Sequence, residues 1–231
     1  MKTKKLKVLG VIPARKGSKG VPNKNFIKVY KNKRLIDYTL IAAKKSKRIS
    51  KIAITTDDTR IIKHSKKYKL DYVIKRQKKY STDYIKSIDV VFDVLKKIKN
   101  FKPDLIILLQ PTSPLRKSQH IDESIELLIR KYKKYNSLVS VSILEEPHPF
   151  KVKKITNNYL VPFIKNKSSE IPRQKLTKVY KLNGSIYLIK KKVLNNKKTF
   201  FNKTMPYIMD EKFSLNIDTL NDLKDLKKMK K

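Results

Sequence analysis

The chain has 231 residues, and its 58 Lys and Arg against 19 Asp and Glu give a formal net charge of +39. This length is sufficient for one large domain with a real core. The chain has no Cys, which excludes disulfides, thiolate metal sites and cysteine nucleophiles. No run approaches about 18 consecutive apolar residues, so no membrane span is expected. The apolar run near the N-terminus is interrupted by Lys7 and does not resemble a secretory signal, so we expect a cytoplasmic protein.

The positive charge consists mostly of lysine. Only eight of the 58 basic residues are Arg, and the lysines are spread along the whole chain rather than gathered in one arm or stripe. A strongly basic chain raises nucleic acid or an anionic membrane as a partner. The Gly and aromatic signature of RNA-recognition sheets is missing. We therefore predict no specific nucleic-acid partner, and a basic nucleic-acid-binding protein stays open as the alternative from a different functional class.

Short β-branched runs alternate with amphipathic segments through the first 144 residues. The strand-like runs cover 6–12, 51–56, 71–75, 104–110 and 137–144, and the amphipathic segments cover 36–47, 58–68, 85–99 and 120–135. Continuous apolar strands joined by crossover helices are typical of a parallel sheet covered on both faces. The pattern predicts an α/β fold with a doubly wound, mostly parallel sheet. Ligands of such sheets bind beyond the carboxyl ends of the strands, so the loops after residues 12, 75 and 110 are the expected site.

The pattern becomes less regular from about Glu145. Several Pro and short strand-like runs follow, and a final amphipathic helix is expected after Asp218 and Thr219. The irregular part lacks the length and apolar content of a separate domain. We predict a single domain over 1–231 with an inserted lobe at about 145–190.

The loop at 13–25 concentrates residue types that are scarce elsewhere. The chain has four Gly, well below the usual ~7%, and two of them, Gly17 and Gly20, lie in this loop beside Arg15 and several Lys. Backbone N–H groups and cations in one turn are what a triphosphate requires. The loop matches neither the Walker pattern nor the GxGxxG pattern, and an ordinary basic surface turn is the alternative.

Five sequence motifs carry a family resemblance: VIPARKGSKGVPNKN (11–25), KRQKKYSTD (75–83), LLQPTSPLR (108–116), PRQKLTKVYKLNGSIY (172–187) and NIDTLNDL (216–223). In this order, from about Val8 to about Leu226, the chain resembles the acylneuraminate cytidylyltransferases, which belong to the sugar nucleotidylyltransferases. The resemblance implies a Rossmann-like nucleotidyltransferase that forms a homodimer through its inserted lobe. It also implies transfer of CMP from CTP to a nonulosonic, sialic-acid-like α-keto sugar acid with release of pyrophosphate.

The resemblance assigns roles to residues at matching positions. Arg15 and Lys24 are expected to be catalytic, because they would neutralise charge on the phosphate oxygens. Asp218 is expected to be catalytic as the ligand of Mg²⁺, the implied cofactor. The further assignments are Ser18, Lys19 and Asn25 with Arg15 and Lys24 for the triphosphate; Arg76 and Ser87 for the cytidine part; and Gln110, Arg173, Asn183, Tyr187, Phe200 and Phe201 for the sugar acid.

Two positions depart from the family pattern. Asn216 stands where the family usually has a second Asp, so a site with two carboxylates is in question. Gln77 replaces the usual Pro after Arg76, which makes base selectivity less secure than phosphate binding. An eight-carbon keto sugar acid is the alternative acceptor, and the sequence does not identify the particular nonulosonic acid.

Several candidate residues also have structural interpretations. Asp218 is a possible N-cap of the last helix, unless Thr219 takes that place. Arg173 is alternatively a lobe-surface or dimer-contact residue. Asp57 and Asp58 are typical of helix N-caps, His148 of a turn, and Asn183 with Gly184 of a hairpin turn.

Overall fold

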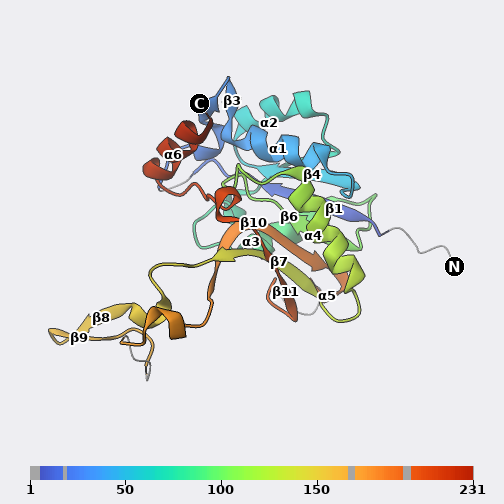
Figure 1. Cartoon of the computed structure of the whole chain (residues 1–231). Coiled ribbons are helices and arrows are strands. Elements are labelled where there is room, and N and C mark those ends of the chain that lie inside the picture. The colour runs from blue at the N-terminus through green and yellow to red at the C-terminus, as the bar shows by residue number, and fades with distance from the viewer. Residues whose placement is uncertain (1–5, 18–19, 166–169, 195–198, 231) are drawn as a thin grey trace.

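A seven-stranded sheet forms the centre of the molecule (Figure 1). The computed structural model describes residues 6–17, 20–165, 170–194 and 199–230. Strands lie in the order β11-β7-β10-β6-β1-β4-β5, and every neighbouring pair is parallel except the two that involve β10. The predicted mostly parallel sheet is confirmed. Its strands are β1 (Val8–Pro13), β4 (Lys51–Thr56), β5 (Tyr72–Lys75), β6 (Leu105–Leu108), β7 (Ser137–Ile143), β10 (Tyr180–Lys190) and β11 (Thr204–Ile208).

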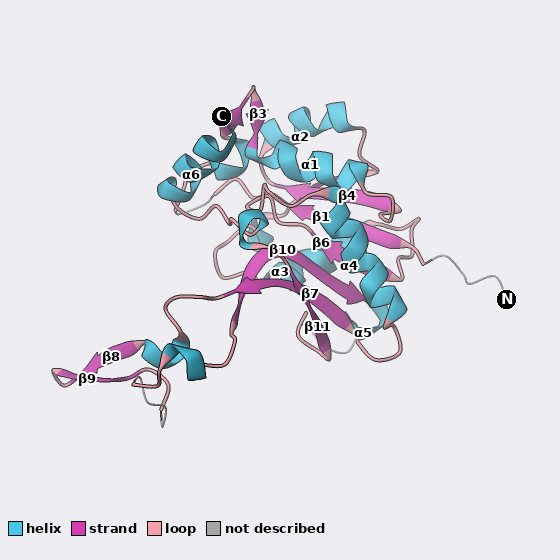
Figure 2. Ribbon diagram, viewed as in Figure 1, coloured by secondary structure: helices cyan, strands magenta, loops and turns pink. Residues whose placement is uncertain are grey.

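Helices cover both faces of this sheet, as Figure 2 shows. Because side chains alternate along a strand, Val8 and Ile12 of β1 pack on one face, and Leu9 and Val11 pack on the other. The first face packs against α1 (Leu35–Lys45), α2 (Thr59–Ser65) and α4 (Ser118–Arg130), and the second against α3 (Ser87–Lys97) and α5 (Lys191–Leu194). The predicted doubly wound arrangement is confirmed. No helix in the described ranges is long and apolar enough to cross a membrane.

Residues 144–179 leave the sheet between β7 and β10 and form the extension that protrudes in Figure 2. The predicted lobe at 145–190 is too long at its end, because residues 180–190 form β10, which pairs with β6 and β7 inside the sheet. The extension carries the hairpin of β8 (Lys153–Thr156) and β9 (Tyr159–Pro162). Its turn residues Asn157 and Asn158 both have positive φ, as a two-residue hairpin turn of the favoured type requires.

His148 has the turn role that the sequence suggests. Its Nδ1 accepts a hydrogen bond from the Phe150 N–H at 3.2 Å, and Nε2 lies 3.1 Å from the carbonyl oxygen of Thr177. The side chain is 4% exposed. It therefore fastens the two chain segments at the base of the extension.

The last helix, α6 (Leu220–Lys230), is capped by Thr219. Thr219 Oγ1 accepts from the Asp222 N–H at 3.2 Å, and Asp222 Oδ2 accepts from the Thr219 N–H at 2.6 Å, which forms a capping box. The side chain of Asp218 takes no part in the cap. Two short strands, β2 (Lys28–Tyr30) and β3 (Lys33–Arg34), form a separate ribbon that contacts α6 and the start of α1.

Candidate functional site

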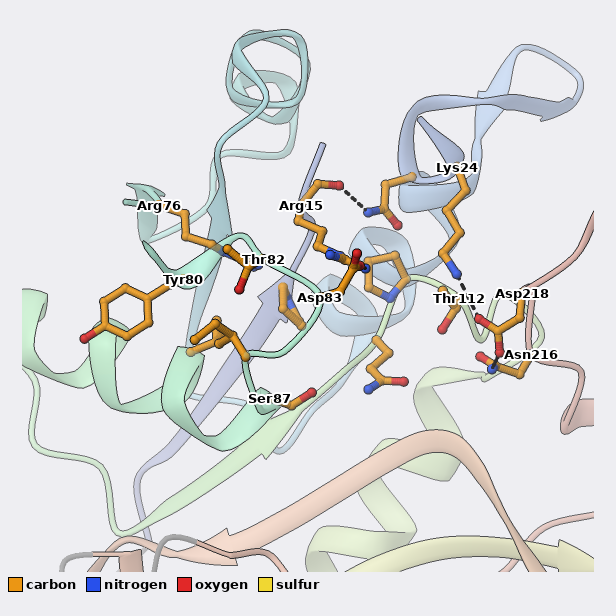
Figure 3. A pocket seen from close by; sticks show the side chains of 16 residues that line it. Arg15, Lys24, Arg76, Tyr80, Thr82, Asp83, Ser87, Thr112, Asn216 and Asp218 are labelled. Atoms are coloured by element: carbon orange, nitrogen blue, oxygen red, sulfur yellow. Dashed lines mark hydrogen bonds and ion pairs between the residues drawn. The ribbon is translucent and has the colours of Figure 1, made fainter. Parts of the chain in front are cut away.

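A cavity of about 330 Å³ opens at the carboxyl ends of β1, β5 and β6 (Figure 3). Its walls come from the loops after these strands, the first turn of α3 and the segment before α6. These are the three loops that the sequence singles out. Of the predicted residues, the cavity brings together Arg15, Lys24, Asn25, Arg76, Ser87, Gln110 and Asp218. The predicted phosphate-loop residues Ser18 and Lys19 lie outside the described residues.

The backbone of the loop after β1 is held by two hydrogen bonds, one at a carbonyl oxygen and one at an N–H group. Asn25 donates its Nδ2–H to the carbonyl oxygen of Arg15 at 2.9 Å, and the Lys16 N–H donates to Asp57 Oδ1 at 2.7 Å. The sequence interpretation of Asp57 as an N-cap is wrong, because its carboxylate binds this loop. Asp58 is the N-cap of α2, as predicted. The backbone that carries Arg15 is therefore held from both sides.

Lys24 lies in the short 3₁₀ turn η1 (Lys24–Phe26), and its side chain points toward Asp218 on one side of the cavity. Its Nζ donates to Asp218 Oδ1 and to the Ile217 carbonyl oxygen, both at 2.9 Å. Asn216 donates its Nδ2–H to the other carboxylate oxygen of Asp218. A Cβ on Gly20 would lie 2.1 Å from the Asp218 carbonyl oxygen, so only glycine fits at this approach of the two segments.

Arg76 is 5% exposed and lies at the end of β5, on the opposite side of the cavity from Lys24. Its Nη2–H donates to the Thr55 carbonyl oxygen at 2.8 Å. Burial lowers the pKa of Arg76 to about 10, against the opposing influence of the Asp57 carboxylate. The guanidinium stays charged near neutral pH, so it is a cation in a poorly solvated wall.

A second cavity of about 440 Å³ adjoins the first, and Ser87 and Gln110 line both. Its other walls include Tyr187 of β10 and the pair Phe200 and Phe201. The rings of Tyr187 and Phe200 lie 5.4 Å apart, and burial raises the pKa of Tyr187. Three aromatic residues that the resemblance assigns to the sugar acid thus form one wall beside the cationic cavity.

The loop that carries Gln110 is held by a buried arginine. Arg116 is 2% exposed and donates to the Ser185 carbonyl oxygen at 2.6 Å, to Thr39 Oγ1 at 2.7 Å and to the Gln110 carbonyl oxygen at 3.3 Å. Burial lowers the pKa of Arg116 to about 9. Gly184 has a φ of +72°, and a Cβ there would lie 3.1 Å from Gln110 Oε1. Gln110 is therefore packed directly against the Gly184 backbone.

Two predicted substrate residues lie outside both cavities. Asn183 is 3% exposed; its Oδ1 accepts from Ser140 Oγ at 2.6 Å, and its Nδ2–H donates to Ser214 Oγ at 3.0 Å. These bonds tie β10 to β7 and to the segment before α6. Arg173 lies on the extension, where its Nε is 3.8 Å from Glu146 Oε1 and its side chain is 68% exposed. Within its own chain, Arg173 has a lobe-surface position.

Sequence reasoning assigned no role to Asp83, although its carboxylate lies in the cavity. Arg15 Nη2 and Asp83 Oδ1 are 2.5 Å apart. A signal was present, because acidic residues are scarce in this chain and Asp83 ends the quoted KRQKKYSTD motif in a loop at the carboxyl edge. Tyr80, Thr82 and Thr112 also line the cavity without having been singled out.

The strand order, a cavity at the carboxyl edge and three basic side chains in its walls are typical of a Rossmann-like fold that binds an anionic ligand such as a nucleotide. A family model described as cytidylyltransferase matches residues 9–230. The chain belongs to the cytidylyltransferase family.

Relatives from bacteria are about one-third identical to the chain. The N-acylneuraminate cytidylyltransferase of Escherichia coli O18:K1:H7 is 31% identical over 217 residues, which is 94% of this chain and 50% of that protein. The chain thus spans about half the length of this relative. The CMP-N,N'-diacetyllegionaminic acid synthase of Legionella pneumophila is 32% identical over 219 residues, which is 93% of this chain and 92% of that protein.

Solved structures share the fold at lower identity. A CMP:2-keto-3-deoxy-manno-octonic acid synthetase complexed with CTP superimposes with a TM-score of 0.71 and 17% identity, covering 96% of this chain and 98% of that one. A 4-diphosphocytidyl-2C-methyl-D-erythritol synthase has a TM-score of 0.65 and 12% identity, with coverage of 97% and 99%. At these identities the likeness establishes the fold alone.

Gly184→Ala is expected to lower the free energy of unfolding by about 1–2 kcal/mol, because a side chain is strained at this positive φ and meets Gln110. Urea unfolding measures the difference. Gly17→Ala is the matched control, because its φ is not positive and no described atom lies within 4 Å of its added Cβ. It should change stability by less than about 1 kcal/mol. Equal losses in both variants would contradict the account of Gly184.

Proposed function

We propose that this chain transfers CMP from CTP to a nonulosonic α-keto sugar acid and releases pyrophosphate. The observation that carries the proposal is the pair of cavities joined at Ser87 and Gln110: one is lined by Arg15, Lys24 and Arg76, and the other by aromatic rings. A cationic cavity suits a triphosphate, and an aromatic wall suits the apolar faces of a sugar. The names of the bacterial relatives, an N-acylneuraminate cytidylyltransferase and a CMP-N,N'-diacetyllegionaminic acid synthase, support the same reaction.

The reaction needs the sugar hydroxyl to attack the α-phosphorus in line with the departing pyrophosphate. An oxygen–phosphorus bond to the sugar forms, the bond to the β-phosphate oxygen breaks, and the hydroxyl proton is released. Positioning and charge neutralisation supply most of the catalysis in such transfers. Arg15, Lys24 and Asn25, with Ser18 and Lys19, hold the triphosphate.

The remaining cavity residues place the two reactants against each other. Arg76 and Ser87, at the end of β5 and the start of α3, hold the cytidine part. Gln110 lies where the two cavities meet, so its amide can contact the sugar beside the α-phosphate. Tyr187, Phe200 and Phe201 line the sugar site.

The donor atoms beside α6 suit Mg²⁺. Asp218 offers a carboxylate, and Asn216 Oδ1 is buried without a hydrogen-bond partner among the described residues. Among the described residues, no group of three or more His, Cys, Asp or Glu could hold a metal ion. Water and phosphate oxygens would therefore supply most of the ligands of the ion, as is usual for Mg²⁺. When bound, the ion would neutralise phosphate charge.

A homodimer forms part of the proposal. The extension exposes Ile155, Tyr159, Leu160 and Phe163 by 76, 73, 69 and 63%. An apolar surface of this kind is typical of protein–protein contacts. Arg173 lies on the same extension, so its proposed contact with the sugar carboxylate requires that a second copy supply it. Sedimentation equilibrium should give twice the 27.2 kDa of one chain, and the mass of a single chain would contradict the dimer.

Lys24→Ala and Arg15→Ala should each lower turnover by about 10²-fold or more while the fold stays intact, because each removes a cation from the phosphate site. Pyrophosphate release with CTP and a panel of acceptors, which contains nonulosonic acids and an eight-carbon keto sugar acid, measures this. Lys28→Ala is the control, because Lys28 is exposed on β2 outside the cavity. Normal turnover by a folded Lys24→Ala protein would contradict the phosphate assignment. Preference for an eight-carbon keto sugar acid in the panel would contradict the acceptor assignment.

Asp218→Ala should abolish most activity, and Asn216→Asp should tighten the apparent affinity for Mg²⁺ modestly. A carboxylate is a stronger ligand than an amide oxygen, but without the ion the new charge would repel Asp218 and lower stability. Mg²⁺ titrations in the presence of CTP and thermal unfolding with and without Mg²⁺ measure both effects. Full activity in EDTA would contradict the metal assignment.

A further inference from the structure

The Arg15–Asp83 ion pair crosses the cavity and joins two of its loops. Arg15 follows β1, whereas Asp83 follows β5 and lies before α3. The two side chains are 31 and 33% exposed, and their nearest nitrogen and oxygen atoms are 2.5 Å apart. Figure 3 shows them meeting in the middle of the cavity. Without a ligand, the guanidinium is thus neutralised by a residue of the chain itself.

A carboxylate at this position opposes the binding of a polyanion. A triphosphate brought to Arg15 would meet the negative charge of Asp83 within a few ångströms, and like charges that close repel each other. The Arg15 guanidinium would also need to exchange its carboxylate partner for phosphate oxygens, since both compete for the same N–H groups. An N–H group of Arg15 that donates to Asp83 is not available to a phosphate oxygen.

The loop with Arg15 is held through its backbone, and the loop with Asp83 is exposed. The Arg15 carbonyl oxygen accepts from Asn25, and the next N–H donates to Asp57. Residues 82–84 are exposed, and Tyr84 is 92% exposed. If the pair separates, the segment around Asp83 is therefore the part that moves.

We propose that Asp83 is a positioning residue that holds Arg15 in the empty cavity and gives way to phosphate oxygens when the nucleotide binds. This inference rests on the proposed function, because it takes the incoming anion to be the nucleotide triphosphate. Phosphate binding then frees the segment 81–86, whose Thr82 and Ile85 line the same cavity. When pyrophosphate leaves, the pair forms again and returns this segment to the cavity wall.

The test is the affinity of inorganic triphosphate, measured by calorimetry without divalent ions at an ionic strength of ~0.05 M. Asp83→Asn keeps the shape of the side chain and removes its charge. Since an exposed ion pair contributes up to about 1 kcal/mol, which is about fivefold in affinity, the variant should bind triphosphate at least ~3-fold more tightly than the wild type. Glu126→Gln is the matched control, because Glu126 pairs with Arg48 at 2.7 Å outside the cavity and has comparable exposure. Its triphosphate affinity should equal that of the wild type.

A second pair of proteins shows whether Asp83 acts through Arg15. In an Arg15→Ala background, the gain in triphosphate affinity from Asp83→Asn should be smaller than in the wild type, because only the direct charge repulsion is left to remove and the competition for the Arg15 N–H groups is absent. Unchanged or weaker binding by Asp83→Asn, or a gain of equal or larger size in the Arg15→Ala background, would overturn the exchange. A wild-type protein that binds neither triphosphate nor CTP would overturn the proposed function as well, whereas normal CTP binding with an inert Asp83→Asn change would overturn the exchange alone.

Discussion

Repulsion between cations at the carboxyl edge of the sheet constrains this structure. The formal net charge is +39, and the loops after β1 and β5 bring Arg15, Lys24 and Arg76 into one cavity. Each of these cations has an oxygen partner from another segment: Asp83 for Arg15, Asp218 for Lys24 and the Thr55 carbonyl for Arg76. These contacts connect the loops to one another. The cations of the cavity are therefore held by oxygen atoms from other segments of the chain, and two of these oxygens belong to carboxylates.

The antiparallel strand β10 explains why two different cavities meet. β10 runs opposite to β6 and β7, so its first half lies at the edge where the parallel strands end. In this register Tyr187 lies opposite Leu108, and Gly184 lies next to Gln110. One strand thus contributes an aromatic wall to the second cavity and a glycine that lets Gln110 approach.

Much of the fold could be predicted from the sequence, because its signals are local. Alternation of apolar strands with amphipathic segments located the strands of the central sheet and the helices α1 to α4 through residue 144, but not the short strands β2 and β3. The prediction that Thr219 could cap α6 in place of Asp218 is confirmed. The position of β10 was not accessible in this way. Its side chains face different neighbours along its length, so the strand resembles the short runs of the extension until its partners β6 and β7 are known.

The site residues, too, divide into those that a local motif predicts and those that depend on contacts distant in the sequence. Arg15, Lys24 and Gln110 lie in contiguous motifs directly after strands, where topology dictates the edge they occupy. Asp83 was missed because its importance depends on a partner 68 positions away, and no local pattern encodes that contact. Arg173 lies in a motif, but its motif falls on the protruding extension. A motif supplies the residue type, whereas only the packed chain determines which cavity that residue can reach.

The central claim is that the cationic cavity binds CTP and the aromatic cavity binds the sugar acid. A crystal structure with bound CTP tests it most directly. The account predicts the triphosphate against Arg15 and Lys24, the cytosine on the side of Arg76 and Ser87, and an empty cavity at Tyr187, Phe200 and Phe201. Cytosine stacked on those aromatic rings, or phosphates remote from Lys24, would contradict it.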